Sequence, residues 1–288
     1  MNEVELLVDA KAIIGEGPIW DDQLQKLLWV DIMGKTIYVY DPVDSSNVRY
    51  DVGQFVGTIV PWRSNEVMLA VQDGFASYNF DTKQLNLITN PEADKPQNRF
   101  NDGKCDPAGR FWAGTMALEN PTNEGALYCM GTDFSVQKKF GGVGISNGIV
   151  WSLDHKIMYY IDSIARNVRA YDYDLATGDI GNERVIIEVP EEIGVPDGMA
   201  IDEEGMLWIA KFHGSRVSRW HPQTGEVLQT IYLPASCITA CAFGDKNLDT
   251  LYITSAALAS GIPGEPLAGG LFAIKPGVRG VSAFRFGG

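Results

Sequence analysis

Oxygen-bearing side chains stand directly before a glycine at several widely separated points in the sequence. Glu16, Asn147 and Asp197 each occupy such a position, and Asp102 occupies another. Carboxylate and amide oxygens suit hard cations such as Ca²⁺, Mg²⁺ and Mn²⁺, and converging carboxylates repel one another unless a cation lies between them. Glu16 and Asp197 would offset the charge of such an ion, and the neutral amide of Asn147 would add a ligand without quenching its Lewis acidity. If the fold brings these residues together, they predict a metal site.

The same residues have a simpler interpretation when each is taken singly. Asp-Gly and Asn-Gly are ordinary turn pairs, and any one of them alone indicates a turn before it indicates a ligand. Asn101 and Asp102 are adjacent, so in an extended strand they point to opposite faces and only one can serve a shared site. Spacing alone does not choose between those two. The lack of histidine and cysteine at these positions argues against a structural zinc site.

The phrase that surrounds Asp197 returns along the whole chain. Each copy reads as a short strand, a polar turn, a β-rich strand, a Gly- or Asn-containing loop and a third alternating strand, and a weaker fourth strand follows. The copies begin at Gly17, Gly57, Gly103, Gly148, Gly198 and, in a looser form, Ala240. Corresponding residues recur at intervals of roughly 40 to 50, with no helical periodicity. The repeat predicts an all-β fold, a six-bladed β-propeller with four antiparallel strands per blade, as one domain over residues 1–288.

This fold would gather residues that are far apart in sequence. The first strand of each blade lines the central channel, so the residues before the repeated glycine form a ring around the axis. They are Glu16, Val56, Asp102, Asn147, Asp197 and approximately Thr239. We also expect the N-terminal strand, residues 4–9, to pair with C-terminal residues 281–286 and so to close the ring without an open sheet edge.

Composition narrows the possible partners. The chain has 23 basic and 37 acidic residues, a net charge of −14, which repels nucleic acid and anionic membranes. Residues 1–10 lack the features of a signal peptide, and no run of about 18 apolar residues is present. The four cysteines form no CxxC pair and are too few for a disulfide scaffold, which favours a reducing compartment and buried thiols. We therefore expect a cytoplasmic monomer.

Four segments of the sequence carry a resemblance to a known family. They are GEGPIW (residues 15–20), NRFNDGKCDPAGRFWAGTM (98–116), ISNGIVWSLDHKIMYYIDS (145–163) and VPDGMAIDEEGMLWIA (195–210). The chain resembles the regucalcin (senescence marker protein), gluconolactonase and luciferin-regenerating enzyme family, and its regucalcin branch in particular. The resemblance extends from the N-terminus to the C-terminal GGLFAIKPGVRGV.

The resemblance implies a six-bladed propeller with one divalent cation in the channel. Matched motif to motif, it assigns the cation to Glu16, Asn147 and Asp197. It implies that Arg99 and Asn101 hold substrate oxygens, with Glu119 nearby, and it favours Asn101 over Asp102 as the channel-facing residue. Members of the family hydrolyse sugar-acid lactones such as gluconolactone, and different members are associated with Ca²⁺, Zn²⁺ or Mn²⁺. The identity of the metal therefore stays open.

Lactone hydrolysis requires a polarised carbonyl, an activated water and stabilisation of the developing oxyanion. Asp197 is our candidate general base. A metal lowers the pKa of a carboxylate that it binds, so Glu119, which has no expected metal contact, is the competing candidate for proton transfer. The guanidinium of Arg99 would donate hydrogen bonds to ring or hydroxyl oxygens, and Asn101 would orient substrate or water.

Two other functions remain open from the sequence. A propeller can be a non-catalytic calcium-binding regulatory or interaction protein, and the same site could hydrolyse another ester-like bond, such as that of an organophosphate. Oxygen donors around the axis favour chemistry over docking. The three histidines, His155, His213 and His221, lie in turn-like segments, so a Ser-His-Asp triad is not expected.

Overall fold

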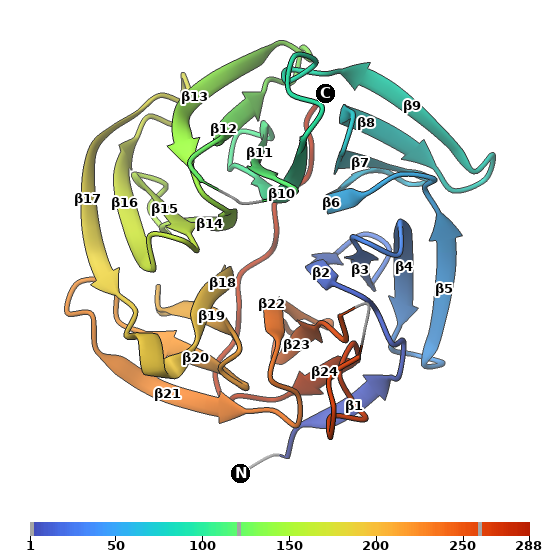
Figure 1. Ribbon diagram of the computed structural model, residues 1–288, viewed down its shortest axis with the longest axis vertical. Coiled ribbons are helices and arrows are strands. Elements are labelled where there is room, and N and C mark those ends of the chain that lie inside the picture. Colours follow the sequence, from blue (N-terminus) through green and yellow to red (C-terminus); the bar gives the residue numbers. More distant parts are fainter. Residues whose placement is uncertain (1–2, 120–121, 259–260) are drawn as a thin grey trace.

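The structure is a computed structural model that describes residues 3–119, 122–258 and 261–288. Its strands form six antiparallel sheets of four strands each, arranged as a ring, and the predicted six-bladed all-β propeller is confirmed (Figure 1). The one helix among the described residues is a short 3-10 turn, η1 (Glu191–Ile193). No helix in this part of the chain is long and apolar enough to cross a lipid bilayer.

The blades follow one another along the chain, each written here from its innermost to its outermost strand. Blade 1 is β2 (Gly15–Asp21), β3 (Lys26–Asp31), β4 (Thr36–Asp41) and β5 (Ser46–Asp51); blade 2 is β6 (Val56–Arg63), β7 (Glu66–Val71), β8 (Gly74–Asn79) and β9 (Gln84–Thr89); blade 3 is β10 (Asn98–Cys105), β11 (Phe111–Ala117), β12 (Gly125–Met130) and β13 (Val136–Val143). Blade 4 is β14 (Ser146–Trp151), β15 (Ile157–Asp162), β16 (Asn167–Tyr173) and β17 (Ile180–Glu188); blade 5 is β18 (Val195–Ile201), β19 (Leu207–Phe212), β20 (Arg216–Trp220) and β21 (Val227–Tyr232); blade 6 is β22 (Ile238–Gly244), β23 (Thr250–Ser255), β24 (Leu271–Ile274) and β1 (Glu5–Val8).

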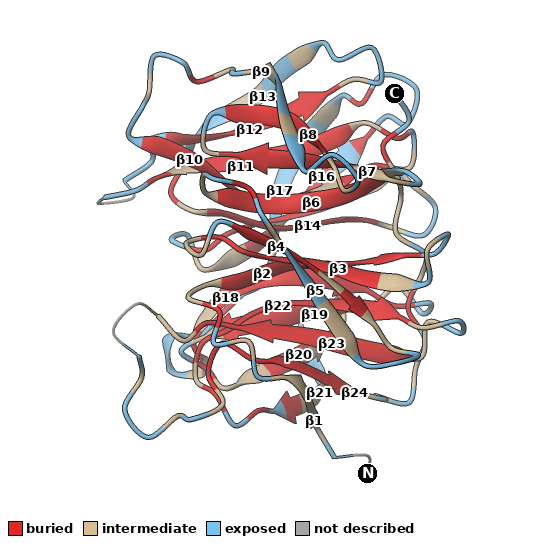
Figure 2. Cartoon of the chain, turned by 90° about the vertical axis from the view of Figure 1, so that its right-hand side faces the viewer, coloured by how far each residue is buried: buried red, intermediate tan, exposed pale blue. Residues whose placement is uncertain are grey.

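Burial falls from the axis to the rim of the ring. The inner strands β2, β14 and β22 are buried along their whole length, whereas the outer strands carry exposed apolar residues such as Leu87 in β9 and Val185 in β17 (Figure 2). An outer strand packs one face on its own blade and turns the other to solvent. This explains why the fourth strand of each copy is the weakest in the sequence.

Repeated tryptophans fix the blades through buried hydrogen bonds. The indole Nε1 of Trp112 donates to Asp106 Oδ2 at 2.8 Å, and Trp208 Nε1 donates to Asp202 Oδ2 at 2.9 Å. Each aspartate directly follows the last residue of its blade's inner strand and also pairs with a neighbouring arginine. Both indoles are fully buried, so the hydrogen bonds satisfy donors that would otherwise be costly to desolvate.

Ring closure is confirmed, but the expected partner of the N-terminal strand is wrong. β1 pairs with β24, with Glu5 opposite Ala273, and not with residues 281–286. Those residues form no strand. They run across the middle of the ring, and Arg285 Nη1 contacts Asp21 Oδ1 at 2.6 Å (Figure 1). The hydrophobic alternation of 281–286 reflects packing against the channel end and not a place in a sheet.

Deleting residues 1–10 should lower the thermal midpoint by roughly 5 °C or more, because β24 would become an open edge and β1 would no longer cover it. Differential scanning calorimetry of the truncated and full-length chains measures the change. A chain lacking only residues 1–3, which precede β1, is the matched control. Equal midpoints for all three chains would show that the pairing of β1 with β24 contributes nothing to stability.

Candidate metal and substrate site

The six inner strands begin at one end of the channel, which we call the upper end, and finish at the lower end. A β-bulge interrupts every one of them near its start. The register shifts lie at Glu16/Ile19, Val56/Thr58, Phe100/Gly103, Asn147/Ile149, Pro196/Met199 and Ile238/Ala240. A bulge breaks strict alternation and re-aims side chains. The Asp-Gly and Asn-Gly pairs of the sequence are therefore bulges within strands and not turns.

The repeated glycine is required because neighbouring inner strands approach each other closely here. A Cβ on Gly57 would lie 2.3 Å from the carbonyl oxygen of Asn101, and one on Gly198 would lie 2.4 Å from the Cβ of Ala240. Both separations are impossible for a side chain without moving the neighbouring blade. The glycines thus hold the upper channel narrow, and the residue before each one is held close to the axis.

Three carboxyl groups interact in the upper channel. Glu16, Asp102 and Asp197 are 4%, 5% and 7% exposed. Burial, followed by the charge of Asp102, raises the pKa of Glu16 to about 8. Burial, followed by the charges of Glu16 and Asp102, raises the pKa of Asp197 well above its usual value, and burial also raises the pKa of Asp102. A bound cation would relieve this repulsion and return the acids to their ionised forms.

Asn147 presents a free amide oxygen to this group. Its Nδ2 donates to Ser163 Oγ at 2.9 Å, and Ser163 Oγ in turn donates to the carbonyl oxygen of Pro196 at 2.6 Å. Because the single hydroxyl proton of Ser163 is used in that bond, Ser163 accepts from Asn147 and fixes which end of the amide faces it. Asn147 Oδ1 is left buried with no hydrogen-bond partner among the described residues. An orphaned buried acceptor next to the Asp197 carboxyl group, which itself interacts with Glu16, fits a cation ligand.

Ser163→Ala should lower divalent-cation affinity by roughly 10- to 100-fold, because Asn147 loses the acceptor that sets its orientation. Titration calorimetry with Ca²⁺ and Mn²⁺ measures the effect, and Ser163→Thr, which keeps the hydroxyl, should restore most of it. Ser135→Ala, on an exposed turn, is the control. Affinities within twofold of each other for Ser163→Ala and the control would contradict an orienting role.

Arg99 and Asn101 form a fixed polar pair. Arg99 Nη1 donates to Asn101 Oδ1 at 2.7 Å, and Asn101 Nδ2 donates to the carbonyl oxygen of Ser146 at 2.7 Å. Burial lowers the pKa of Arg99 to about 10, and the charges of Glu16 and Asp197 act in the opposite direction. The guanidinium thus lies within electrostatic reach of both acids.

The argument that only Asn101 or Asp102 could face the channel assumed an unbroken extended strand, which β10 is not. The bulge between Phe100 and Gly103 removes the alternation on which that argument rested, and both side chains are 5% exposed. Asp102 Oδ1 accepts from the Gly103 amide at 2.7 Å, and its Oδ2 has no partner among the described residues. No three His, Cys, Asp or Glu side chains within those residues gather closely enough to hold a metal. Asp102 acts on Glu16 and Asp197 through its charge.

The remaining predicted residues lie apart from this group. Glu119 is exposed on the loop after β11, and the structure does not bring it into the buried acid cluster. Thr239 Oγ1 donates to the carbonyl oxygen of Gly15 at 2.5 Å, which ties blade 6 to blade 1. Val56 is an apolar member of the ring and fully buried. Of the predicted ring, Glu16, Asp102 and Asp197 interact through their charges, and the Asn147 side chain contacts Asp197.

Sequence reasoning missed three residues that shape the channel. Ser163 ends the segment quoted for the family resemblance, but nothing in the sequence tied it to Asn147. Lys104 donates from Nζ to the carbonyl oxygen of Met199 at 2.6 Å, across the channel from its own blade. Lys211 is fully buried in β19. A lysine inside the apolar run LWIAKF was a visible signal for that residue. All four cysteines are buried and free, as predicted.

Comparison with known proteins identifies the family. The SMP-30/Gluconolactonase/LRE-like region matches residues 14–257. Regucalcin of Danio rerio and regucalcin of Homo sapiens are each 40% identical to the chain, and each match covers 99% of both proteins. Among solved structures, a luciferin-regenerating enzyme matches with a TM-score of 0.92 and 36% identity over 99% of both chains. A calcium-binding protein, regucalcin, from Agrobacterium tumefaciens matches with a TM-score of 0.93 and 25% identity over 98% of this chain and 96% of that one. The chain therefore belongs to the SMP-30/gluconolactonase/LRE-like family, with regucalcins among its relatives over its full length.

Proposed function

We propose that this protein is a metal-dependent hydrolase that opens sugar-acid lactones. Glu16, Asn147 and Asp197 would hold one divalent cation, Ca²⁺, Zn²⁺ or Mn²⁺, at the upper end of the channel. The observation that carries the proposal is the buried, unpartnered Oδ1 of Asn147 next to Asp197, whose carboxyl group interacts with Glu16, both acids having raised pKa values. The family to which the chain belongs includes gluconolactonases, which supports the reaction class.

A bound divalent cation supplies Lewis acidity, which polarises a carbonyl group and lowers the pKa of water. The protein supplies position and proton transfer. Asp197, ionised when its charge is compensated, would accept the proton of the attacking water. The ester oxygen of the ring would then leave and take up a proton, and the product is the open hydroxy acid. Glu119 is the competing candidate for this proton transfer.

Arg99 and Asn101 would position the substrate. The Nη1 of Arg99 is engaged by Asn101 and by the carbonyl oxygen of Phe100, so the guanidinium is held in one place before substrate arrives. Its remaining donors suit the hydroxyl and ring oxygens of a sugar acid. The amide of Asn101 is fixed at both ends, so it would set the orientation of Arg99 as well as contact substrate.

Glu119→Gln separates the two candidates for proton transfer. Because Glu119 is exposed and lies outside the acid cluster, we expect its replacement to lower turnover by less than about threefold with cation affinity unchanged. Initial rates of gluconolactone hydrolysis and calcium titration measure both quantities. A fall of 10²-fold or more with the cation retained would move the proton-transfer role from Asp197 to Glu119.

The proposed activity is tested directly by removing and restoring the metal. Protein stripped with a chelator should not hydrolyse lactones, and separate addition of Ca²⁺, Mn²⁺, Zn²⁺ and Mg²⁺ identifies which ion restores the rate. A panel of five- and six-membered sugar lactones, with an aryl ester and an organophosphate as controls, defines the bond that is cleaved. Cation binding without hydrolysis of any substrate would favour the alternative, a calcium-binding regulatory propeller. A relative from Agrobacterium tumefaciens is described as a calcium-binding protein.

We further propose that residues 1–288 act as one domain and as a cytoplasmic monomer that binds neither nucleic acid nor membranes. The net charge of −14 supports the last point, because it repels polyanions. Gel filtration with light scattering tests the monomer.

A further inference from the structure

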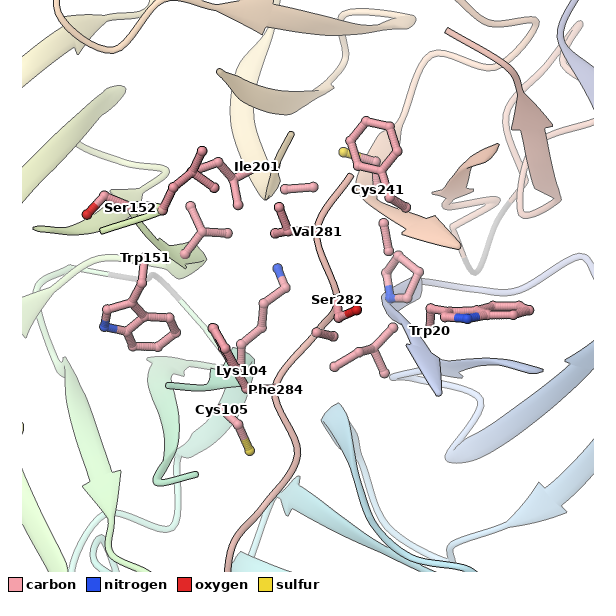
Figure 3. A pocket seen from close by; sticks show the side chains of 18 of the residues that line it. Trp20, Lys104, Cys105, Trp151, Ser152, Ile201, Cys241, Val281, Ser282 and Phe284 are labelled. Carbon is pink, nitrogen blue, oxygen red and sulfur yellow. The ribbon is translucent and has the colours of Figure 1, made fainter. Parts of the chain in front are cut away.

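A second cavity lies at the lower end of the channel, opposite the acid cluster. Its volume is about 270 Å³. Its walls are the final residues of several inner strands and the C-terminal segment 281–284 (Figure 3). They are mostly apolar and include Trp20, Trp151, Ile201, Phe243, Val281 and Phe284. We call this space the lower chamber.

The C-terminal wall of the lower chamber is a strap fixed at its two ends. The Gly280 amide donates to the carbonyl oxygen of Leu248 at 2.8 Å, and the Phe286 amide donates to that of Pro61 at 2.9 Å. Between these anchors, residues 281–284 make no backbone-to-backbone hydrogen bond within the part of the chain that the structure describes. The strap can therefore adjust to a bound ligand without breaking backbone hydrogen bonds. The bonds at Gly280 and Phe286 hold its two ends in place.

Lys104 supplies the one cationic side chain of lysine or arginine among the residues that line the chamber. Its Nζ extends toward the middle of the space (Figure 3) and donates to the carbonyl oxygen of Met199. Within the described residues, no carboxylate oxygen lies within 4.0 Å of it. An ammonium has three N–H donors, and the bond to Met199 uses one of them. The other two remain for a ligand. Other polar side chains of the lining, Ser152, His155 and Ser282, carry no fixed positive charge.

The chamber and the acid cluster are separate in chemistry. Lys104 comes two residues after Asp102 on β10, and its charge acts on Asp102 and Glu16 above it. Below Lys104 the walls are apolar, so a hydrated sugar acid has few partners there. An apolar body would displace water from Trp20, Trp151 and Phe284, and an anionic end would meet the ammonium.

We propose that the lower chamber is a binding site for a small apolar carboxylate, with the carboxylate on Lys104 and the apolar body among the aromatic side chains. The site is distinct from the lactone site and does not need the divalent cation. A flat ring joined to a carboxylate by a short chain suits its size and charge. Occupation would place a ligand against the C-terminal strap and beneath the acid cluster.

Titration calorimetry with 4-phenylbutyrate, in chelator to keep the upper site free of metal, tests the proposal. We expect saturable binding with a dissociation constant on the order of 0.1 to 1 mM, since one aromatic ring is buried. Lys104→Met keeps the length of the side chain and removes its charge, and should weaken binding of the acid by about tenfold or more. The neutral 4-phenylbutanol should bind Lys104→Met and the unmodified chain equally.

Ala242→Phe supplies the second arm, because Ala242 lines the chamber and a larger side chain there would fill it. It should abolish binding of both compounds, with circular dichroism and thermal midpoint confirming that the fold is kept. Lactone hydrolysis by the metal-loaded Ala242→Phe variant serves as a further check of folding. The proposal is overturned if neither compound saturates the unmodified chain below about 5 mM, or if Lys104→Met binds the acid as well as the unmodified chain does. Unchanged binding by a folded Ala242→Phe variant would place the ligand elsewhere.

Discussion

Replacing Asp197 by alanine should abolish divalent-cation binding and lactone hydrolysis together. Asp197 is buried, and the charges of Glu16 and Asp102 raise the pKa of its carboxyl group. It is both a proposed metal ligand and the proposed general base. Removing it leaves Glu16 as the one carboxylate ligand beside Asn147. We expect turnover to fall by roughly 10³-fold or more, and calcium affinity to fall below detection in titration calorimetry.

Asp197→Asn distinguishes the ligand role from a structural one. It keeps the shape of the side chain and removes its charge, so the fold should survive while cation binding and turnover are both lost. Asp172→Ala, which removes an exposed carboxylate from blade 4, is the matched control and should change neither. Full turnover in Asp197→Ala would refute a metal site formed by Glu16, Asn147 and Asp197.

Replacing Lys211 by methionine should stabilise the protein strongly. Lys211 is fully buried, and its Nζ has no hydrogen-bond partner among the described residues. The Nζ lies 5.1 Å from the centroid of the Trp220 ring, a cation–π contact. Burial lowers the pKa of Lys211 from 10.5 to about 7. Methionine has a similar length and no amine to desolvate, so the thermal midpoint should rise by several degrees.

The stability gained by Lys211→Met should depend on pH. Between pH 7 and 10.5 the unfolded chain holds a proton on Lys211 that the folded chain releases, so folding becomes less favourable as pH falls across that window. The advantage of Lys211→Met should be small at pH 10.5, should grow by up to about tenfold in the unfolding equilibrium constant for each unit of pH, and should level off below pH 7.

Urea unfolding of metal-free protein at a series of pH values measures this dependence. Lys246→Met, at an exposed lysine, is the control and should follow the unmodified chain at every pH. An advantage for Lys211→Met that does not change between pH 7 and 10 would show that packing, and not the buried amine, sets the difference. A loss of stability in that variant at all pH values would contradict the prediction outright.

The sequence by itself determined the fold and the candidate ligands. A repeat of about 40 to 50 residues with four strand signals cannot bury its apolar faces except against further copies, so the number of copies defined the number of blades. The position before the repeated glycine varies while framework positions agree in type, and this difference alone singles out Glu16, Asn147 and Asp197.

Only the tertiary structure decided how those residues are aimed. Alternation in an extended strand would let only one of Asn101 and Asp102 face the channel, but β10 has a bulge between Phe100 and Gly103 and buries both side chains, at a point where neighbouring blades approach closely. The orientation of the Asn147 amide depends on Ser163, which lies in the turn directly after β15, the next strand of the blade. The path of residues 281–286 could not be predicted from the sequence either. Their alternating pattern is the same whether the segment pairs in a sheet or packs, without forming a strand, against the end of the channel. Local pattern fixes which elements form, whereas contacts between blades fix what each side chain faces.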